Sequence, residues 1–279
     1  RSRLSDGGRI GTDRSGQMDG RNLGLGLAGA VDRSVIRRVA AIAEAKGFAT
    51  FWLNDTPEGD SLAGLAEAAR ATTSIRLGTG VIPLDRQDAA AILRRVADLQ
   101  LPESRLTIGV GSGRAKDLRS LVTEQVELLK RQSQAQIYLG ALGPKMRALA
   151  VDVADGVLLN MLPVHGAEQA VADMKGTARE RGRQPIKTAL YVRVSLGAAA
   201  RARLEEEAAR YERFPSYAAN FARLRVRAVD TAVIGASAAD LQRGLAPYRR
   251  VVDETVVRAI TAHDNVEEYE ALMNAMTAV

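Results

Sequence analysis

The chain has 279 residues, of which 46% are hydrophobic, no cysteine and a formal net charge of +6. The absence of cysteine excludes disulfides, thiolate catalysis and cysteine-ligated metals. The sequence has no apolar run of the roughly 18 residues that a membrane helix needs, and no charged-then-apolar leader. Only 4% of the residues are aromatic and the arginines are scattered, so platforms for stacked bases are scarce. We therefore expect a cytoplasmic protein whose partner is a small molecule, not a membrane or a nucleic acid.

The first 21 residues differ in composition from the rest of the chain. Residues 1–21 are rich in Gly, Ser, Asp and Arg and show no apolar period. Such a segment cannot bury enough apolar surface to order itself. We expect an arm that is disordered or was added in cloning, followed by one folded domain over residues 22–279.

From residue 22 onward, short apolar runs alternate with longer amphipathic ones. The strand-like runs are Leu23–Ala28, Thr50–Asn54, Ile75–Ile82, Leu106–Val110, Gln136–Leu139, Gly156–Asn160, Ile186–Leu196 and Glu254–Ile260. The helix-like segments, whose apolar residues recur at three and four, are Arg33–Lys46, Leu62–Thr72, Ala89–Leu101, Asp117–Arg131, Lys145–Val153, Glu168–Arg181, Ala200–Glu212, Ala238–Val252 and Val266–Val279.

Strands that are apolar on both faces, each followed by a helix, are typical of a parallel sheet covered by helices. Eight such repeats favour an α/β fold of one domain, the closed (β/α)8 TIM barrel. An open doubly wound sheet is the alternative. However, no Gly-x-Gly-x-x-Gly follows the first strand, because Gly24-Leu-Gly26 lies within it.

In a barrel of this kind the active site forms at the carboxyl ends of the strands. The candidates at the predicted strand ends are Asn54-Asp55-Thr56, Gly78–Val81 with Arg86, Gly109–Arg114, Gly140–Lys145, Asn160 with His165, and His263. Glycines gather at three successive strand ends, as a flat ring laid against the backbone would require. Structural roles are open as well: Asp55 can cap a helix, the two histidines can lie in loops, and Trp52 and Met146 can pack in the core. The two isolated histidines predict no metal site.

The turn Gly140–Lys145 is the most informative of these strand ends. Gly140 and Gly143 remove side chains where a ligand can approach, and Pro144 is preset for the first turn of a helix. The N–H groups at a helix start favour an anion, and Lys145 adds a positive charge. The same residues also serve as a plain tight connection, so both interpretations stay open on these residues alone.

Four motifs in this order resemble the luciferase-like monooxygenase family and, within it, the coenzyme F420-dependent (deazaflavin) oxidoreductases. They are residues 47–55 (GFATFWLND), 68–81 (AARATTSIRLGTGV), 106–111 (LTIGVG) and 139–146 (LGALGPKM) with 154–160 (ADGVLLN). The resemblance runs from about Leu23 to Ile260. It implies a barrel that holds coenzyme F420, or alternatively FMN, at the strand ends.

The resemblance also implies roles for particular residues. A cis peptide without proline at Gly80–Val81 would back the cofactor ring, Asp55 would lie beside it, and the loops around residues 111–113 and 140–143 would hold the phosphate. The implied cofactor-binding set is Asp55, Thr79, Gly80, Val81, Gly111, Ser112, Gly113, Gly140, Ala141, Leu142, Gly143, Pro144 and Lys145. The catalytic candidates are Asp55, Ser112 and His263, with Arg86, Asn160 and His165 as further residues of the substrate side.

Two departures from the family pattern limit the transfer. Relatives that oxidise sugar phosphates carry a histidine where this chain has Thr56, and Ser112 replaces a common glutamate, so their general acid or base is missing. We expect hydride transfer between F420 and a small organic substrate. An FMN-dependent monooxygenase and a cofactor-binding barrel without turnover are the alternatives, and the resemblance also allows a homodimer.

Overall fold

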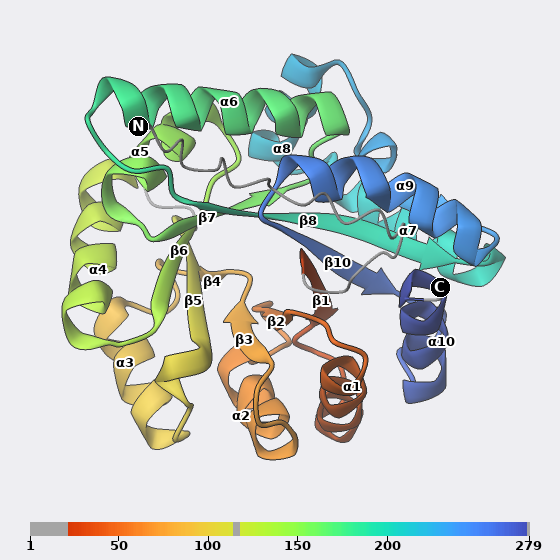
Figure 1. The fold of residues 1–279 in the computed structure, drawn as a ribbon. Coiled ribbons are helices and arrows are strands. Elements are labelled where there is room, and N and C mark those ends of the chain that lie inside the picture. Colours follow the sequence, from red (N-terminus) through yellow and green to blue (C-terminus); the bar gives the residue numbers. More distant parts are fainter. Residues whose placement is uncertain (1–21, 114–117, 278–279) are drawn as a thin grey trace, which may run out of the picture.

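The computed structural model describes residues 22–113 and 118–277, whose strands close into a barrel (Figure 1). The ring consists of β1 (Leu23–Ala28), β2 (Thr50–Asn54), β3 (Arg76–Thr79), β5 (Leu106–Gly111), β6 (Gln136–Gly140), β7 (Gly156–Asn160), β8 (Lys187–Leu196) and β10 (Glu254–Ile260). All these strands run parallel, and β10 pairs with both β8 and β1, which closes the sheet. The predicted TIM barrel is therefore confirmed. The predicted arm, residues 1–21, lies outside the described residues.

Helices surround the barrel on its outer face (Figure 1). They are α1 (Arg33–Ala45), α2 (Ser61–Ala71), α3 (Ala89–Asp98), α4 (Leu118–Gln132), α5 (Pro144–Val153), α6 (Val164–Glu180), α7 (Ala198–Tyr211), α8 (Pro215–Leu224), α9 (Ala238–Val251) and α10 (Val266–Thr277), with 3-10 turns at Glu103–Arg105 and Ala228–Thr231. Within the described residues, none of them combines the length and the apolar character that a membrane crossing requires.

The first three helices begin in the same way. Asp32, Asp60 and Asp88 precede α1, α2 and α3, and each carboxylate accepts a hydrogen bond from a backbone N–H of the first turn. Such a cap satisfies a donor that the helix itself leaves without a partner. Each of these helices therefore begins at a defined residue after the strand that precedes it.

The structure differs from the predicted elements in three places. The predicted strand Ile75–Ile82 is two strands, β3 and β4 (Ile82–Pro83), because the chain leaves the ladder at Gly80 and Val81 and rejoins it beside β5. Helix α6 begins at Val164, so His165 lies in its first turn and not in a loop.

The third difference is an addition that the sequence did not predict. Helix α8 and the short strand β9 (Val233–Gly235) lie between α7 and α9, and β9 pairs with the end of β8 outside the ring. A strand of three residues is too short to show a period of two. The connection from β8 to β10 is therefore the longest in the described barrel, and it carries extra structure.

Three aromatic side chains fill the barrel interior. Trp52, Tyr138 and Tyr191 are each at most 4% exposed and form one cluster. The indole N–H of Trp52 donates to Glu254 Oε1 over 2.8 Å, which satisfies its polar atom at the bottom of the barrel. Trp52 is thus a core residue, as predicted, but it faces the inside of the ring.

Glycines on β3 and β7, and Gly80 just after β3, make room for these rings. A Cβ added at Gly78 would lie 2.3 Å from the Trp52 ring, one at Gly156 2.5 Å from the Tyr138 ring, and one at Gly80 2.1 Å from the Tyr191 hydroxyl oxygen. Atoms cannot approach so closely without displacement. Gly78 and Gly80, two of the glycines that suggested a bound flat ring, therefore accommodate the protein's own rings.

We predict that Gly78→Ala destabilises the fold by about 1–3 kcal/mol, because the new methyl group overpacks a rigid indole ring. Urea unfolding would measure the loss. Gly176→Ala is the matched control: Gly176 lies within α6 and has no atom within 4 Å of an added Cβ. The control should raise stability by about 0.5–1 kcal/mol. Equal unfolding midpoints for Gly78→Ala and the parent chain would contradict this packing argument.

Candidate functional site

A cavity of about 710 Å³ opens at the carboxyl ends of the barrel strands. Strands β2, β4, β5, β6, β7 and β8 reach it, and α7 and α8 form its other wall. The predicted site residues that line it are Asn54, Asp55, Thr56, Gly80, Val81, Gly111, Ser112, Gly113, Gly140, Ala141, Leu142, Gly143 and Asn160. The structure thus brings together residues from five separate segments at the edge where a TIM barrel carries its active site.

The peptide bond between Gly80 and Val81 is cis, as the resemblance implied. Two neighbours hold this segment. The Gly80 N–H donates to Leu53 O over 2.9 Å, and the Asn54 side-chain amide donates to Gly80 O over 2.5 Å. The segment between β3 and β4 is therefore anchored to β2 on the cavity side.

The side chain of Val81 lies between two glycines of the neighbouring strands. A Cβ added at Gly111 or Gly140 would come within 2.7 Å or 3.0 Å of a Val81 methyl group. Glycine at both positions therefore lets Val81 lie flat across the ends of β5 and β6. The result is a smooth apolar patch on the cavity wall.

Asp55 is held at the rim by two partners. Its Oδ2 accepts from the Ser61 hydroxyl over 2.8 Å at the start of α2, and its Oδ1 pairs with Arg86 Nη2 at 2.5 Å. The side chain is only 3% exposed. Two elements therefore hold this carboxylate in one position, α2 through Ser61 and the segment after β4 through Arg86.

The turn from β6 into α5 exposes backbone to the cavity. Gly143 is the N-cap of α5 and makes no side-chain cap, and a Cβ added there would have no atom within 4 Å. The turn is fixed from below, where the Ala141 N–H donates to Leu158 O over 3.0 Å. An uncapped helix start of this kind suits an anion.

Four of the implied cofactor or catalytic residues do not line the cavity. Thr79 is buried and ties β3 to β5, since its hydroxyl donates to Gly109 O over 3.0 Å and accepts from Gly109 N over 2.9 Å. Pro144 and Lys145 lie on the exposed side of the first turn of α5. His263 lies elsewhere, as described below.

The sequence did not predict the wall opposite Val81. It comes from Tyr211 at the end of α7 and from Tyr217, Asn220 and Arg223 on α8. The Tyr211 and Tyr217 rings pack edge to face with centroids 4.7 Å apart. The signal was present in the sequence: Tyr211, Phe214, Tyr217 and Phe221 recur at helical spacing in a chain with only 4% aromatic residues.

A buried arginine joins this wall to the barrel. Arg193 on β8 donates to Asn160 Oδ1 and to Glu207 Oε1, both over 2.8 Å, and its guanidinium lies 4.5 Å from the centre of the Tyr211 ring. Asn160 in turn donates to the Tyr217 hydroxyl over 2.8 Å. Burial raises the pKa of Tyr217 to about 12, so this hydroxyl keeps its proton.

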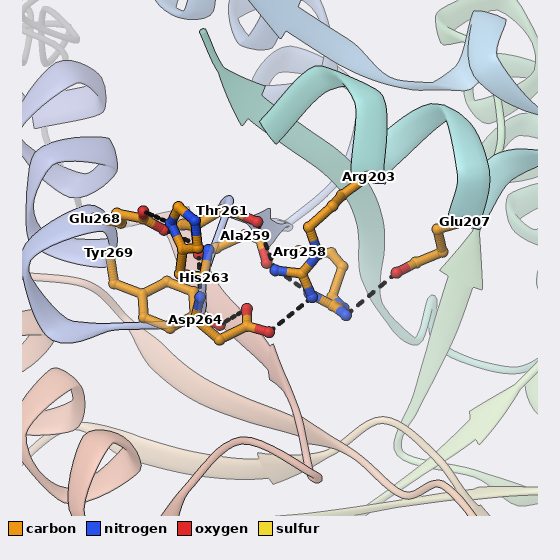
Figure 2. Close-up of polar contacts among 9 residues, drawn as sticks. All are labelled: Arg203, Glu207, Arg258, Ala259, Thr261, His263, Asp264, Glu268 and Tyr269. Carbon is orange, nitrogen blue, oxygen red and sulfur yellow. Dashed lines mark hydrogen bonds and ion pairs between the residues drawn. The ribbon is translucent and has the colours of Figure 1, made fainter. Parts of the chain in front are cut away.

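Figure 2 shows the polar network on the outer side of Glu207. Glu207 also pairs with Arg258 at 3.4 Å, while Arg203 pairs with Asp264 at 2.7 Å. His263 lies at the far end of this group, where its Nδ1 contacts Glu268 at 2.6 Å and its side chain is 75% exposed. His263 is therefore remote from the cavity, which separates it from Asp55 and Ser112.

Several buried polar atoms at the cavity have no hydrogen-bond partner among the described residues. They are Asn54 Oδ1, Thr56 Oγ1, Tyr191 Oη and Asn220 Nδ2. Buried polar groups are normally paired, because an orphaned group costs about 1–3 kcal/mol. Such groups indicate a cavity built for a ligand with polar atoms. Within the described residues, no group of three or more His, Cys, Asp or Glu could hold a metal ion.

A closed parallel barrel with a ligand-sized cavity at its strand ends defines the class of (β/α)8 enzymes. The chain belongs to the luciferase-like monooxygenase family, whose model matches residues 18–122 and 117–276. Members of this family are oxidoreductases that use F420 or FMN.

Similar proteins are found by sequence and by structure. The chain is 28% identical over 186 residues to a 5,10-methylenetetrahydromethanopterin reductase of Methanolobus tindarius, an alignment that covers 54% of this chain and 57% of that protein. The coenzyme F420-dependent tetrahydromethanopterin reductase of Methanopyrus kandleri has a TM-score of 0.69 at 17% identity, covering 92% of this chain and 97% of that one. An F420-dependent secondary alcohol dehydrogenase in complex with an F420-acetone adduct has a TM-score of 0.71 at 14% identity, covering 91% and 98%. At these identities the two structures show the shared fold.

We predict that Glu207→Gln lowers the free energy of unfolding by about 3–5 kcal/mol, because it removes the charge between two largely buried arginines. Thermal or urea unfolding would measure the loss. Glu206→Gln on the exposed face of α7 is the control, and its effect should stay within about 0.5 kcal/mol. Similar losses in the two variants would contradict the role of the buried pair.

The ion pairs of Glu207 with Arg193 and Arg258 also predict how stability depends on pH. Burial alone would raise the pKa of Glu207, but the Arg258 and Arg193 cations hold it below its ordinary value of 4.5. A depressed folded-state pKa gives stability that is complete above the unfolded-state value and is lost as the pH falls through the folded-state value. The stability difference between the parent chain and Glu207→Gln should therefore shrink below about pH 4.5. A difference that grows with acidification would contradict this sign.

Proposed function

We propose that this chain binds coenzyme F420 in the cavity and exchanges hydride between it and a small organic substrate. The observation that carries the proposal is the joint presence, on one cavity wall, of the flat Val81 patch and the uncapped glycine turn before α5. A planar ring with a phosphate-bearing tail needs these two surfaces side by side. The relatives whose names include F420 support the same cofactor.

The residues of the cavity fit such a cofactor. Gly80 and Val81 would back the ring, and Gly111–Gly113 with Gly140–Gly143 would face the ribityl chain and the phosphate. The orphaned Asn54 Oδ1 and Tyr191 Oη lie at the same wall, where polar ring atoms would supply partners. Thr79, Pro144 and Lys145 would then act through the backbone that they hold, not by direct contact.

When bound, F420 supplies two-electron hydride chemistry, and the protein orients its ring and excludes competing reactions. Asp55 would present its carboxylate at the rim, held by Arg86 and Ser61, and Ser112 would offer a hydroxyl to the same cavity. Tyr217 and Asn160, which are bonded to each other, would face the substrate from the opposite wall. His263 has no part in this arrangement, because it lies outside the cavity.

FMN is the alternative cofactor, with monooxygenase chemistry as the alternative reaction. The oxygenating constituent of 3,6-diketocamphane monooxygenase, whose structure contains FMN, has a similar fold. It is 13% identical to this chain and has a TM-score of 0.68. The backbone surfaces named above suit either ring. A cytoplasmic location and a homodimer also remain predictions of the sequence.

Absorbance titration of the protein with each cofactor is the direct test. We expect saturable binding of F420, followed by bleaching of the bound cofactor on addition of an oxidisable substrate. Preferential binding of FMN and oxygen uptake would favour the monooxygenase instead. A bound cofactor that no substrate reduces would indicate a carrier, and absence of binding for both cofactors would refute the proposal.

We predict that Gly143→Val weakens cofactor binding at least about tenfold, because a side chain at the N-cap would occupy the space in front of the α5 amides. The fold should be unaffected, since the added Cβ meets no atom within 4 Å and the backbone there is extended. Fluorescence titration measures the affinity, and an unchanged melting temperature serves as the control. Unaltered affinity would remove the phosphate from this turn.

A further inference from the structure

Two buried N–H groups, one on α8 and one on α5, have no partner among the described residues. Asn220 is 4% exposed and its Nδ2 is unpaired, and Arg147 is 3% exposed and its Nε is unpaired. Asn220 lines the cavity from α8, whereas Arg147 lies behind the glycine turn on α5. Both groups are donors, so what they lack is an acceptor.

Positive charge exceeds negative charge around these donors. Arg147 Nη1 donates to Leu142 O over 3.1 Å, and the carboxylate of Asp173 is 3.9 Å from Nη2 and largely solvated. Arg223 extends from α8 onto the cavity wall and donates to Asn220 Oδ1. Burial and the nearby Arg223 cation lower the pKa of Arg147. Two arginines thus approach each other with little compensation, an arrangement that a bound anion would stabilise.

We propose that Asn220 and Arg223 of α8, supported by Arg147 of α5, form an anion-binding site at this end of the cavity. The ligand is a phosphate or carboxylate group, which belongs either to the cofactor or to the substrate. Asn220 and Arg223 contact the anion directly. Arg147 is a positioning residue: it holds the turn at Leu142 and adds charge from behind. The cofactor source rests on the proposed function, whereas the anion site itself does not.

The roles of these three residues follow from their places in the fold. The Asn220 amide is oriented by Arg223, because its Oδ1 accepts from that guanidinium and its Nδ2 therefore remains free to donate. The uncapped start of α5 faces the same space through Gly143. Helix α8 thus supplies side-chain donors opposite the backbone donors of α5, so that an anion would be held from two sides.

The test compares ligands that differ only by a phosphate-bearing tail or a phosphate. F420 and its dephosphorylated deazaflavin chromophore form one pair, and FMN and riboflavin form the other. Each is titrated by fluorescence into the parent chain, Arg223→Ala, Arg223→Lys and Asn220→Asp at constant ionic strength. Arg179→Ala on the exposed end of α6 is the matched control, because it removes the same charge away from the cavity. Inorganic phosphate is tested separately by its effect on the melting temperature.

If the cofactor carries the anion, Arg223→Ala lowers the affinity for the phosphorylated ligand about 10- to 100-fold, the range of one charge-assisted hydrogen bond. The affinity for the dephosphorylated ligand should change less than about twofold. Arg223→Lys should retain part of the affinity, and Asn220→Asp should lose as much as Arg223→Ala, because it places a negative charge at the site. If the substrate carries the anion, both cofactor forms bind unchanged, and only the stabilisation by inorganic phosphate is lost.

Equal binding of every ligand to the parent chain and to Arg223→Ala would overturn the inference. Equal weakening of the phosphorylated and dephosphorylated ligands would also overturn it, because the contact would then be with the ring. Failure of the parent chain to bind F420 and FMN refutes the proposed function alone. In that case the inorganic phosphate measurement still decides whether the anion site exists.

Discussion

Trp52, Tyr138 and Tyr191 occupy the barrel interior, and each packs against a glycine of another part of the ring, where a side chain would not fit. The rest of the cavity depends on this packing. Tyr191 fills the space directly beneath Gly80, so the segment that leads to Val81 cannot sink into the barrel. Val81 is held at the surface of the packed interior, where its side chain covers Gly111 and Gly140. The floor of the site is therefore an extension of the core, with the rigidity of a packed interior.

Most of the barrel could be predicted from the sequence because its signals are local. Eight apolar runs predicted the positions of the eight ring strands, and the amphipathic segments between them predicted helices that the structure confirms. The division of Ile75–Ile82 into β3 and β4 was not visible as a break in hydrophobicity. It depends on the backbone at Gly80 and Val81, which the family motif indicated and the apolar pattern did not.

The α8 wall could not be predicted for a different reason. Its residues reach the cavity through contacts that are far apart in the sequence, such as Asn160 with Tyr217 and Arg193 with Glu207. A helical spacing of aromatic residues shows that a helix exists, but not which cavity it faces. The strand-end rule found Asp55 and Ser112 because it concerns barrel strands, and it says nothing about an added helix. The same rule brought His263 into the candidate set, although its side chain turns toward Glu268.

The two walls of the cavity have different origins in the chain. The Val81 wall consists of strand ends and tight turns whose shape the barrel interior determines, whereas the α8 wall belongs to the added segment between β8 and β10. Changes in the length or sequence of that segment would leave the ring strands and their glycines intact. The segment between β8 and β10 can therefore vary, whereas the strand-end wall must keep its glycines. A new substrate preference could arise by remodelling one connection, while the strand ends of the opposite wall keep their shape.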